Sequence, residues 1–318
     1  MPTDDLNSTY DVVVVVGGAA GLNGALMLAR SRRSVVVIDA GQPRNAPAHA
    51  VHGLLARDGM PPAELLERGR TEVRSYGGAV VAGTVATVDQ LPTGFAVRLA
   101  DGREVSARRL LVTAGVVDEL PEIPGLSERW GRDVVHCPYC HGWEVRDRAI
   151  GVLASTPMVA HQALLFRQLS DDVTVFSHTV ELPSEDRERL RARDIRIVDG
   201  TVAGLQIGDD RITAVVLADG TVVPRDVVTV QSRAVARAGF LTGLGLTAIE
   251  HPMGMGTYVV ADQTGKTSVP GVYLAGNVSD LGAQVGAAAA AGALAGARIN
   301  ADLVEEETAA AVADFVRV

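Results

Sequence analysis

The chain has 318 residues, of which 47% are hydrophobic, and its 38 acidic residues outnumber its 29 basic residues, giving a net charge of −9. This length fits one large domain or two medium domains with a sizeable core. The acidic balance argues against a nucleic-acid partner and against binding to an anionic membrane surface, because both would require a basic face.

Neither end of the chain has the pattern of a targeting or membrane segment. Residues 1–11 are polar and acidic, without a basic segment followed by an apolar one, so they predict no secretory signal. Residues 283–297 are mainly alanine and glycine and are too few to span a bilayer. We therefore expect a cytoplasmic protein with no membrane partner.

The first part of the chain has the pattern of a strand–helix–strand unit. Residues 11–16 are rich in valine, which is typical of a buried parallel strand, and residues 17–21 are a glycine–alanine turn. Residues 22–31 have helical character, and residues 34–38 predict a second strand that runs into Asp39. This order is typical of the opening of a dinucleotide-binding fold.

The turn between this strand and helix takes the place of a GxGxxG motif. Gly18 would let a pyrophosphate approach the backbone, and Gly21 would allow the helix to pack closely. The start of the helix, with Ala19 and Ala20, would present free N–H groups to the phosphates. Asp39, at the end of the second strand, is placed to bind a ribose hydroxyl.

One position departs from this motif, because Val16 stands where the first glycine is expected. That glycine normally permits the tight turn, and a β-branched residue should strain it. Two interpretations remain open at this point. Either the extra Gly17 reshapes the turn, or the site binds its nucleotide less tightly.

A similar unit is predicted in the middle of the chain. Residues 108–112 predict a further strand of the first unit, and residues 117–125 carry two prolines and predict a linker. Beyond this linker, a strand–helix–strand pattern covers residues 149–154, 159–169 and 173–176.

The last part of the chain returns to the first unit. Residues 239–256 are rich in glycine and predict the return linker, and residues 271–275 predict a last strand before an alanine-rich helix from about Gln284. We therefore predict an α/β protein with two Rossmann-like dinucleotide-binding domains, the second inserted in the first. The expected boundaries are 1–116 with 249–318 for the first domain, and 117–248 for the inserted one.

The chain has only two cysteines, which lie in the run His136-Cys137-Pro138-Tyr139-Cys140-His141. A lone CxxC is more typical of a redox pair than of a structural disulfide, and a thiolate from such a pair attacks disulfides or passes electrons to an acceptor. Zinc is disfavoured, because a Cys2His2 site normally spaces its histidines further from its cysteines. We predict no metal.

His141 directly follows the second cysteine and is the natural residue to handle protons. Near neutral pH, a histidine can take a proton from a thiol and return it to a leaving thiolate. Its imidazolium form would also lower the pKa of a neighbouring cysteine. The alternative is a histidine on a helix surface that lies beside the motif by chance.

Together these motifs resemble the low-molecular-weight thioredoxin reductases over nearly the full length of the chain. The matching blocks are residues 11–21, 39–42 (DAGQ), 113–115 (TAG), the CxxC motif and 267–285 (TSVPGVYLAGNVSDLGAQV). The resemblance implies a thioredoxin reductase-like fold, bound FAD and a homodimer. It implies FAD contacts at Gly18, Ala19, Ala20, Gly21, Asp39, Ala40, Gln42, Thr113, Ala114, Gly115, Gly276, Asn277, Gln284 and Val285.

The chain departs from this family at both nucleotide sites. Asn277 stands where family members usually have aspartate; it can still bond a ribityl hydroxyl but adds no charge. The family's second GxGxxA turn, for NADPH, is replaced by residues 153–159 (LASTPMV), and residues 177–179 (SHT) lack its arginines. We infer that the fold remains and NADPH binding is lost; the alternative is a divergent site that still uses a nicotinamide.

A flavin and a CxxC pair without a nicotinamide site resemble the FAD-dependent dithiol oxidases of natural-product and antibiotic biosynthesis, such as those for gliotoxin, holomycin and romidepsin. His141 fits that group, since thioredoxin reductases commonly have aspartate there. The resemblance implies a small-molecule dithiol substrate, O2 as the electron acceptor and H2O2 as a product. It also implies that Cys140 faces the flavin and that Cys137 exchanges with the substrate.

Two other functions remain open. The same missing nicotinamide motif would suit a protein-disulfide or thioredoxin reductase that receives electrons from ferredoxin or another carrier. A flavin-binding or redox-sensing protein without catalytic activity is the third possibility, favoured by the unusual Val16.

Overall fold

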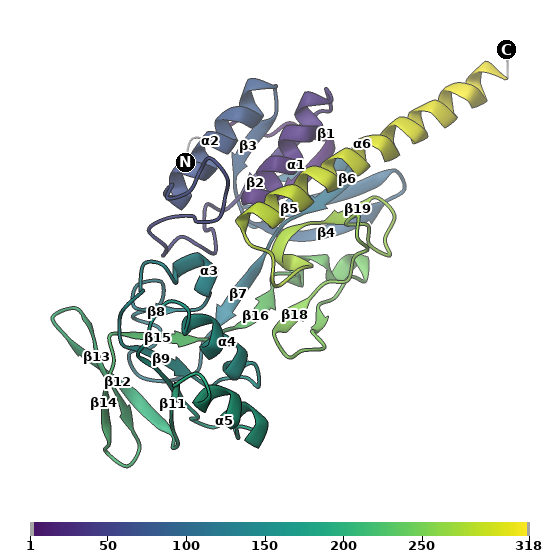
Figure 1. The fold of residues 1–318 in the computed structure, drawn as a ribbon. Coiled ribbons are helices and arrows are strands. Elements are labelled where there is room, and N and C mark those ends of the chain that lie inside the picture. Colours follow the sequence, from purple (N-terminus) through teal and green to yellow (C-terminus); the bar gives the residue numbers. More distant parts are fainter. Residues whose placement is uncertain (1–2, 317–318) are drawn as a thin grey trace. The chain divides into compact units, whose positions relative to one another are not determined.

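The structure is a computed structural model that describes residues 3–316 (Figure 1). Its contacts divide the chain into two compact units. The first contains the chain up to Ala46, residues 61–117 and the chain from Ala234 onward, and the second contains residues 47–60 and 118–233. The predicted α/β architecture, with one domain inserted in the other, is confirmed.

The first unit is built on a seven-stranded sheet in the order β3-β2-β1-β6-β5-β4, with β19 also paired to β6. The pairs among β3, β2, β1, β6 and β19 are parallel, whereas β4, β5 and β6 pair antiparallel. The strands are β1 (Thr9–Val15), β2 (Val35–Asp39), β3 (Ala79–Ala82), β4 (Val85–Leu91), β5 (Gly94–Leu99), β6 (Glu104–Val112) and β19 (Val272–Leu274).

The described part of this unit has three α-helices, α1 (Ala19–Arg30), α2 (Pro62–Ser75) and α6 (Val285–Phe315). Val12 and Val14 of β1 face a core shared with α1 and α6, whereas Val13 and Val15 face the opposite core. The two faces follow from the alternation of side chains along a strand, and both are apolar because the sheet is covered on both sides. The run of valines from Val12 to Val15 in β1 is thereby explained.

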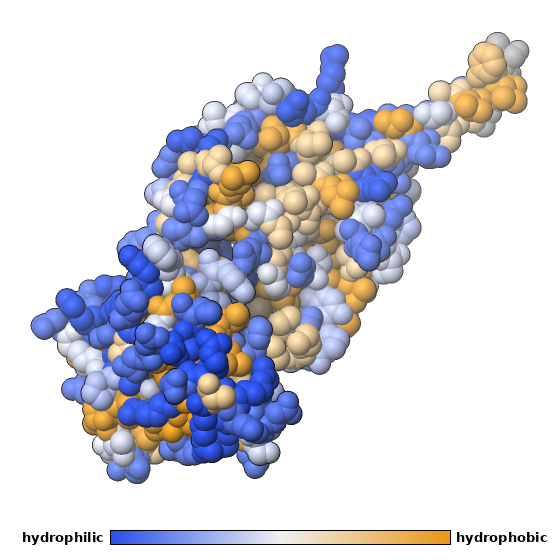
Figure 2. Space-filling view, viewed as in Figure 1, coloured by the Kyte–Doolittle hydropathy of each residue, from blue (hydrophilic) through white to orange (hydrophobic). Residues whose placement is uncertain are grey.

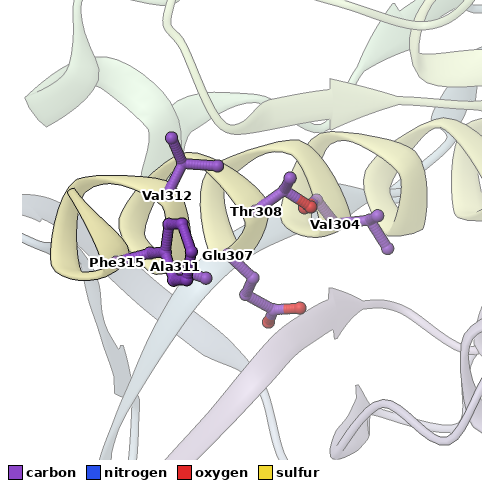
Figure 3. A pocket seen from close by; sticks show the side chains of 6 residues that line it. All are labelled: Val304, Glu307, Thr308, Ala311, Val312 and Phe315. Atoms are coloured by element: carbon purple, nitrogen blue, oxygen red, sulfur yellow. The ribbon is translucent and has the colours of Figure 1, made fainter.

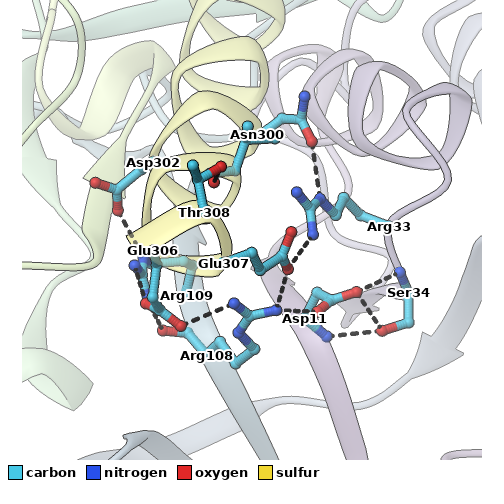
Figure 4. A network of polar contacts seen from close by, with 11 residues as sticks. Asp11, Arg33, Ser34, Arg108, Arg109, Asn300, Asp302, Glu306, Glu307 and Thr308 are labelled. Atoms are coloured by element: carbon cyan, nitrogen blue, oxygen red, sulfur yellow. Dashed lines mark hydrogen bonds and ion pairs between the residues drawn. The ribbon is translucent and has the colours of Figure 1, made fainter. Parts of the chain in front are cut away.

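The helix α6 is 31 residues long, and ion pairs near its middle join it to the sheet (Figure 4). Arg109 donates to Asp302 and Glu306 over 2.7 and 2.6 Å, and Arg108 donates to Glu306 and Glu307. Since both arginines lie on β6, the network fixes α6 against this strand.

Beyond this network, α6 is exposed up to Phe315. Apolar side chains gather on this end of the helix (Figure 2), where Phe315 is 83% exposed. One face of it forms an open pocket (Figure 3), lined by Val304, Glu307, Thr308, Ala311, Val312 and Phe315. This pocket is formed by α6 alone and contains none of the predicted site residues.

The chain leaves the first unit within β7 (Val116–Glu119), inside the predicted linker 117–125, and returns within β16 (Arg233–Ala236). The return thus precedes residue 249, the expected boundary. Its reason is packing: Leu241 of the 3-10 helix η1 (Gly239–Leu244) and the following Leu246 are buried in the core of the first unit. The strands β17 (Ile249–Glu250) and β18 (Gly256–Tyr258) then join a sheet with β16 and β7.

The second unit has a five-stranded parallel sheet in the order β11-β10-β9-β15-β8, and a three-stranded antiparallel sheet β12-β13-β14. Helices α3 (Pro138–His141), α4 (Val159–Phe166) and α5 (Ser184–Arg191) accompany them. The strands are β8 (Val134–Val135), β9 (Ile150–Leu153), β10 (Val173–Phe176), β11 (Arg196–Val198), β12 (Val202–Gly208), β13 (Arg211–Leu217), β14 (Val222–Pro224) and β15 (Val227–Val230).

Within residues 3–316, no helix combines the length and the apolar character that crossing a membrane requires.

Candidate functional site

The predicted FAD residues of the first unit come together at one edge of its sheet. Most of them lie at or just after the ends of β1, β2, β6 and β19, and Gln284 and Val285 lie at the start of α6. These strands are parallel and adjacent in the order β2-β1-β6, with β19 on β6. The carboxyl ends of parallel strands meet at the same edge, which is where dinucleotides bind in such sheets. The order of the motifs in the chain therefore produces one cluster in space.

Val16 carries the left-handed turn that a glycine was expected to provide. Its φ is +78°, whereas Gly17 is not among the residues with positive φ, so Gly17 does not relieve the strain. The turn is held on both sides: Val16 N–H donates to the Ile38 carbonyl over 2.8 Å, and the Thr113 hydroxyl donates to the Val16 carbonyl over 2.6 Å. The interpretation in which Gly17 reshapes the turn is therefore wrong.

A Val16→Gly variant should be more stable than the wild type by about 0.5–1 kcal/mol. Left-handed backbone costs an L-residue roughly 1–2 kcal/mol, and the greater freedom of unfolded glycine and the lost packing of Val16 offset part of the gain. Urea unfolding of both proteins without cofactor measures the difference. A lower free energy of unfolding in the variant would show that the packing of Val16 outweighs its backbone strain.

Gly18 and Gly21 differ in what surrounds them. A Cβ on Gly18 would have no atom within 4 Å, so the protein itself does not require glycine there. A Cβ on Gly21 would overlap the Val16 carbonyl oxygen and lie 2.6 Å from Thr113 Oγ1. Gly21 is therefore needed for packing, and Gly18 leaves open space that suits an approaching pyrophosphate.

Asp39 ends β2 at the same edge and is buried. Its Oδ2 accepts from Arg70 Nη2 of α2 over 3.2 Å, and its Oδ1 accepts from the Gly41 N–H over 3.2 Å. A carboxylate has lone pairs for further donors, so these contacts leave capacity for a ribose hydroxyl. Arg70 Nε is buried without a partner in the described structure, which also suits a polar group bound beside Asp39.

Asn277 closes the loop before α6. Its amide group donates to the carbonyls of Asp280 and Ala283 over 3.0 and 2.9 Å, and an aspartate could not make these bonds. None of the described hydrogen bonds of Asn277 uses its Oδ1, which stays available to a ligand hydroxyl. The departure from aspartate thus has a local structural reason.

The remaining predicted FAD residues lie at the same edge in different settings. Thr113 and Ala114 are buried, Gly115 and Gly276 have φ of +66° and +76°, and Ala40, Gln42 and Gln284 are exposed. Gln284 is the N-cap of α6, so Val285 begins the helix as expected. These positions fit a cofactor that lies over the strand ends, with the exposed side chains around it.

The cysteine pair lies in the second unit, at the start of α3. Cys137 is the N-cap of this short helix and forms a disulfide with Cys140, with a Cα–Cα distance of 5.2 Å. Gln162 of α4 donates to the His136 carbonyl over 2.9 Å and so anchors the residue before Cys137. The two thiols predicted to act as a pair are thus placed for reversible disulfide chemistry.

His141 is half-buried at the end of α3. Burial lowers its pKa, the nearby Glu144 carboxylate raises it, and His52 and His49 lower it through their positive charge. A lowered pKa favours the neutral imidazole, which can accept a proton from a thiol. His141 is therefore placed beside the disulfide in a form suited to a base.

The second nucleotide turn, between β9 and α4, is occupied by the protein's own side chains. The hydroxyl of Thr156 contacts Gln231 Oε1 and accepts from the Met158 N–H over 3.3 Å, and Ser155 donates to the Gln231 carbonyl over 2.8 Å. The bond from Met158 uses an N–H at the start of α4 that a phosphate would need. Ala154 and Val159 on either side are fully buried.

His178 stands after β10, where the family's arginines for a 2′-phosphate would be expected. Its Nδ1 accepts from the Val202 N–H over 3.0 Å, and burial lowers its pKa. An accepting Nδ1 with a lowered pKa favours the neutral ring, which offers no positive charge to a phosphate.

Sequence reasoning missed Arg70 and Gln231. Neither lies near a motif: Arg70 is on α2, and Gln231 follows β15 and reaches the second turn only through the fold. Within residues 3–316, no group of three or more histidine, cysteine or acidic side chains could hold a metal ion.

Comparisons with known proteins place the chain in a family. The family model described as pyridine nucleotide-disulphide oxidoreductase matches residues 10–295. Thioredoxin reductase tcpT of Claviceps purpurea is 31% identical, over 94% of this chain and 96% of the relative. Thioredoxin reductase sirT of Leptosphaeria maculans is 28% identical, over 95% of this chain and 97% of the relative.

Among solved structures, that of HlmI is similar with a TM-score of 0.91, at 46% identity over 99% of both chains. An oxidoreductase from Agrobacterium tumefaciens has a TM-score of 0.87 at 34% identity, over 93% of this chain and 99% of its own. The resemblance to thioredoxin reductases is thus confirmed in sequence and fold. The chain belongs to the pyridine nucleotide-disulphide oxidoreductases, as an oxidoreductase of the thioredoxin reductase-like type.

Proposed function

We propose that this protein is an FAD-dependent dithiol oxidase that forms an intramolecular disulfide in a small-molecule dithiol and passes the electrons to O2. The observation that carries the proposal is the second nucleotide turn, where the Thr156 hydroxyl, bonded to Gln231, takes up the Met158 N–H that a phosphate of NADPH would use. A flavoprotein with a redox disulfide and no nicotinamide site must obtain its electrons elsewhere. A dithiol substrate is the direct source, since it reduces the cysteine pair by exchange.

FAD fits the first unit on two observations. Gly18 has open space where a Cβ would lie, and the Oδ1 atom of Asn277 is free of the described hydrogen bonds. The residues proposed to hold it are those at the strand ends, with Asp39 for a ribose and Gly18 for the pyrophosphate. When bound, FAD would accept two electrons from the cysteine pair and pass them to O2, giving H2O2.

The cysteine chemistry begins from the Cys137–Cys140 disulfide. A substrate thiolate attacks the sulfur of Cys137, and Cys140 leaves as a thiolate. The second substrate thiol then displaces Cys137, which releases the cyclic substrate disulfide and leaves the enzyme pair reduced. We assign His141 the proton transfers, accepting a proton from each substrate thiol and returning it to a leaving thiolate. Overall, dithiol and O2 become disulfide and H2O2.

The second candidate is a thioredoxin or protein-disulfide reductase that takes electrons from ferredoxin or another carrier. It is favoured by the relatives that carry the name thioredoxin reductase. It shares the cysteine pair and FAD with the first candidate and differs in the direction of electron flow. Reduction of thioredoxin by this protein with reduced ferredoxin would support it.

The test is an anaerobic stopped-flow measurement of flavin absorbance. The purified protein is mixed with NADPH, then with dithiothreitol, then with air. We expect no reduction by NADPH, bleaching by the dithiol, and recovery with H2O2 release in air. Rapid bleaching by NADPH would contradict the proposal and return the chain to the nicotinamide-dependent reductases.

The homodimer belongs to the same proposal. It is supported by the exposed apolar end of α6, where Val312 and Phe315 are 56% and 83% exposed. Light scattering of the purified protein measures its molar mass, and a value of one chain would contradict the dimer. The cytoplasmic location stays a prediction.

A further inference from the structure

The segment 47–60 follows β2 along the chain, yet it packs with the second unit. It folds back on itself, because the Val51 N–H donates to the Met60 carbonyl over 2.8 Å and the Gly59 N–H to the Val51 carbonyl over 2.9 Å. This closed loop carries His49 and His52 to the region of α3. The inserted domain is therefore completed, beside its disulfide, by residues from outside the insertion.

His52 lies between two carboxylates. Its Nδ1 is 3.3 Å from Asp58 Oδ2, and its Nε2 is 3.3 Å from Glu144 Oε1. Carboxylates only accept hydrogen bonds, so the ring donates to both only when both nitrogens carry protons. Asp58 is itself fixed, since its Oδ1 accepts from the Gly53 N–H over 3.0 Å. The loop thus holds the His52 ring in a fixed orientation, with Nε2 3.3 Å from Glu144 Oε1.

Glu144 is three residues after His141, in the turn that follows α3. Its side chain is 42% exposed and, without a partner, would sample several rotamers in water. The contact with His52 restricts the Glu144 side chain to rotamers that point toward the loop 47–60. The carboxylate is close enough to His141 to favour its charged form, against the burial that disfavours it.

We propose that His52 is a positioning residue that holds the Glu144 carboxylate beside His141. The role assigned to His141 rests on the proposed function, in which this ring must both accept and release protons. A half-buried imidazole without a nearby carboxylate would hold a proton poorly, and thiolate leaving groups would then lack a donor. Glu144 stabilises the protonated form of His141, and His52 holds the Glu144 carboxylate in position.

The charged groups that act on His141 are Glu144, His52 and His49. The helix α4, which packs against α3, adds the neutral Gln162, and the disulfide does not titrate. His52 therefore has two opposing effects. Its own positive charge disfavours a proton on His141, whereas its hold on Glu144 favours one.

Because the two effects are opposite, the direction in which the His141 titration midpoint moves tests the proposal. Oxidised full-length protein, labelled with carbon-13 at histidine Cε1, is titrated by NMR, and the His141 signal is identified by its absence in His141→Gln. Glu144→Gln should move the His141 midpoint to lower pH. His52→Gln should also move it to lower pH, because loss of Glu144 positioning outweighs loss of the His52 charge.

His49→Gln is the matched control. Like His52→Gln, this variant removes a positive charge near His141. Among the described residues no ion pair joins His49 to Glu144, so in this variant the His141 midpoint should move to higher pH. If His52→Gln also moves to higher pH, His52 acts only through its charge and the proposal is overturned. An unchanged midpoint in Glu144→Gln overturns it equally.

The titration needs no turnover, so it separates this proposal from the proposed function. The acid limb of the dithiol turnover rate should follow the NMR midpoints, moving to lower pH in Glu144→Gln and in His52→Gln. Midpoints that move as expected in a protein that turns over no dithiol would uphold the positioning role and refute the oxidase. A turnover profile that does not follow the midpoints would refute the link between His52 and catalysis.

Discussion

Replacing either cysteine with serine is expected to abolish dithiol turnover while FAD stays bound. In Cys137→Ser and in Cys140→Ser the remaining thiol cannot form the intramolecular disulfide that the structure shows. A serine hydroxyl is not oxidised in its place, so the loss should be at least ~10³-fold in kcat. Oxygen consumption with dithiothreitol measures turnover, and the flavin absorbance per chain measures bound FAD.

The double variant should be no worse than either single variant, because the two cysteines act as one unit. Tyr139→Phe is the matched control, since Tyr139 lies between the cysteines and is 67% exposed. It should keep turnover near the wild-type rate. A single serine variant that retains more than about a tenth of the wild-type rate would contradict the assignment of the pair.

The parts of the fold that were predicted correctly are those set by local patterns. The valines of β1 and the glycines of the following turn lie close together in the sequence, and both were read from periodicity and backbone chemistry. Strain at Val16 was predicted for the same reason, because left-handed backbone is unfavourable for a β-branched residue whatever surrounds it. The family resemblance supplied the FAD residues, whereas their common edge follows from the strand order that the structure shows.

The features that were missed depend on contacts between distant segments. Gln231 meets Thr156 only because β15 lies beside β9 in the sheet, and strand order cannot be read from either segment alone. The loop 47–60 was not separated from the first domain, since nothing in its composition shows that it packs elsewhere. The return to the first unit precedes residue 249 because Leu241 and Leu246 pack there, in a stretch whose glycines suggested a linker.

A Gly18→Ala variant should fold as well as the wild type and lose its FAD. The φ of Gly18 is −76°, which alanine adopts freely, and a Cβ there would have no atom within 4 Å. We therefore expect the free energy of unfolding without cofactor to change by less than about 0.5 kcal/mol. The methyl group would fill the space proposed for the pyrophosphate, which should weaken FAD binding by ~100-fold or more.

Gly21→Ala, three residues later, should have the opposite effects. It should lower the free energy of unfolding without removing FAD. Its Cβ would overlap the Val16 carbonyl oxygen, and backbone held by Thr113 cannot move aside cheaply. Overpacking of this kind costs about 1–3 kcal/mol, against a gain of about 1 kcal/mol in helix propensity. Urea unfolding of the two variants without cofactor, with FAD titrations of each, separates the effects. If Gly18→Ala binds FAD as tightly as the wild type, the pyrophosphate does not lie against this turn, because the open space at Gly18 is what places it there.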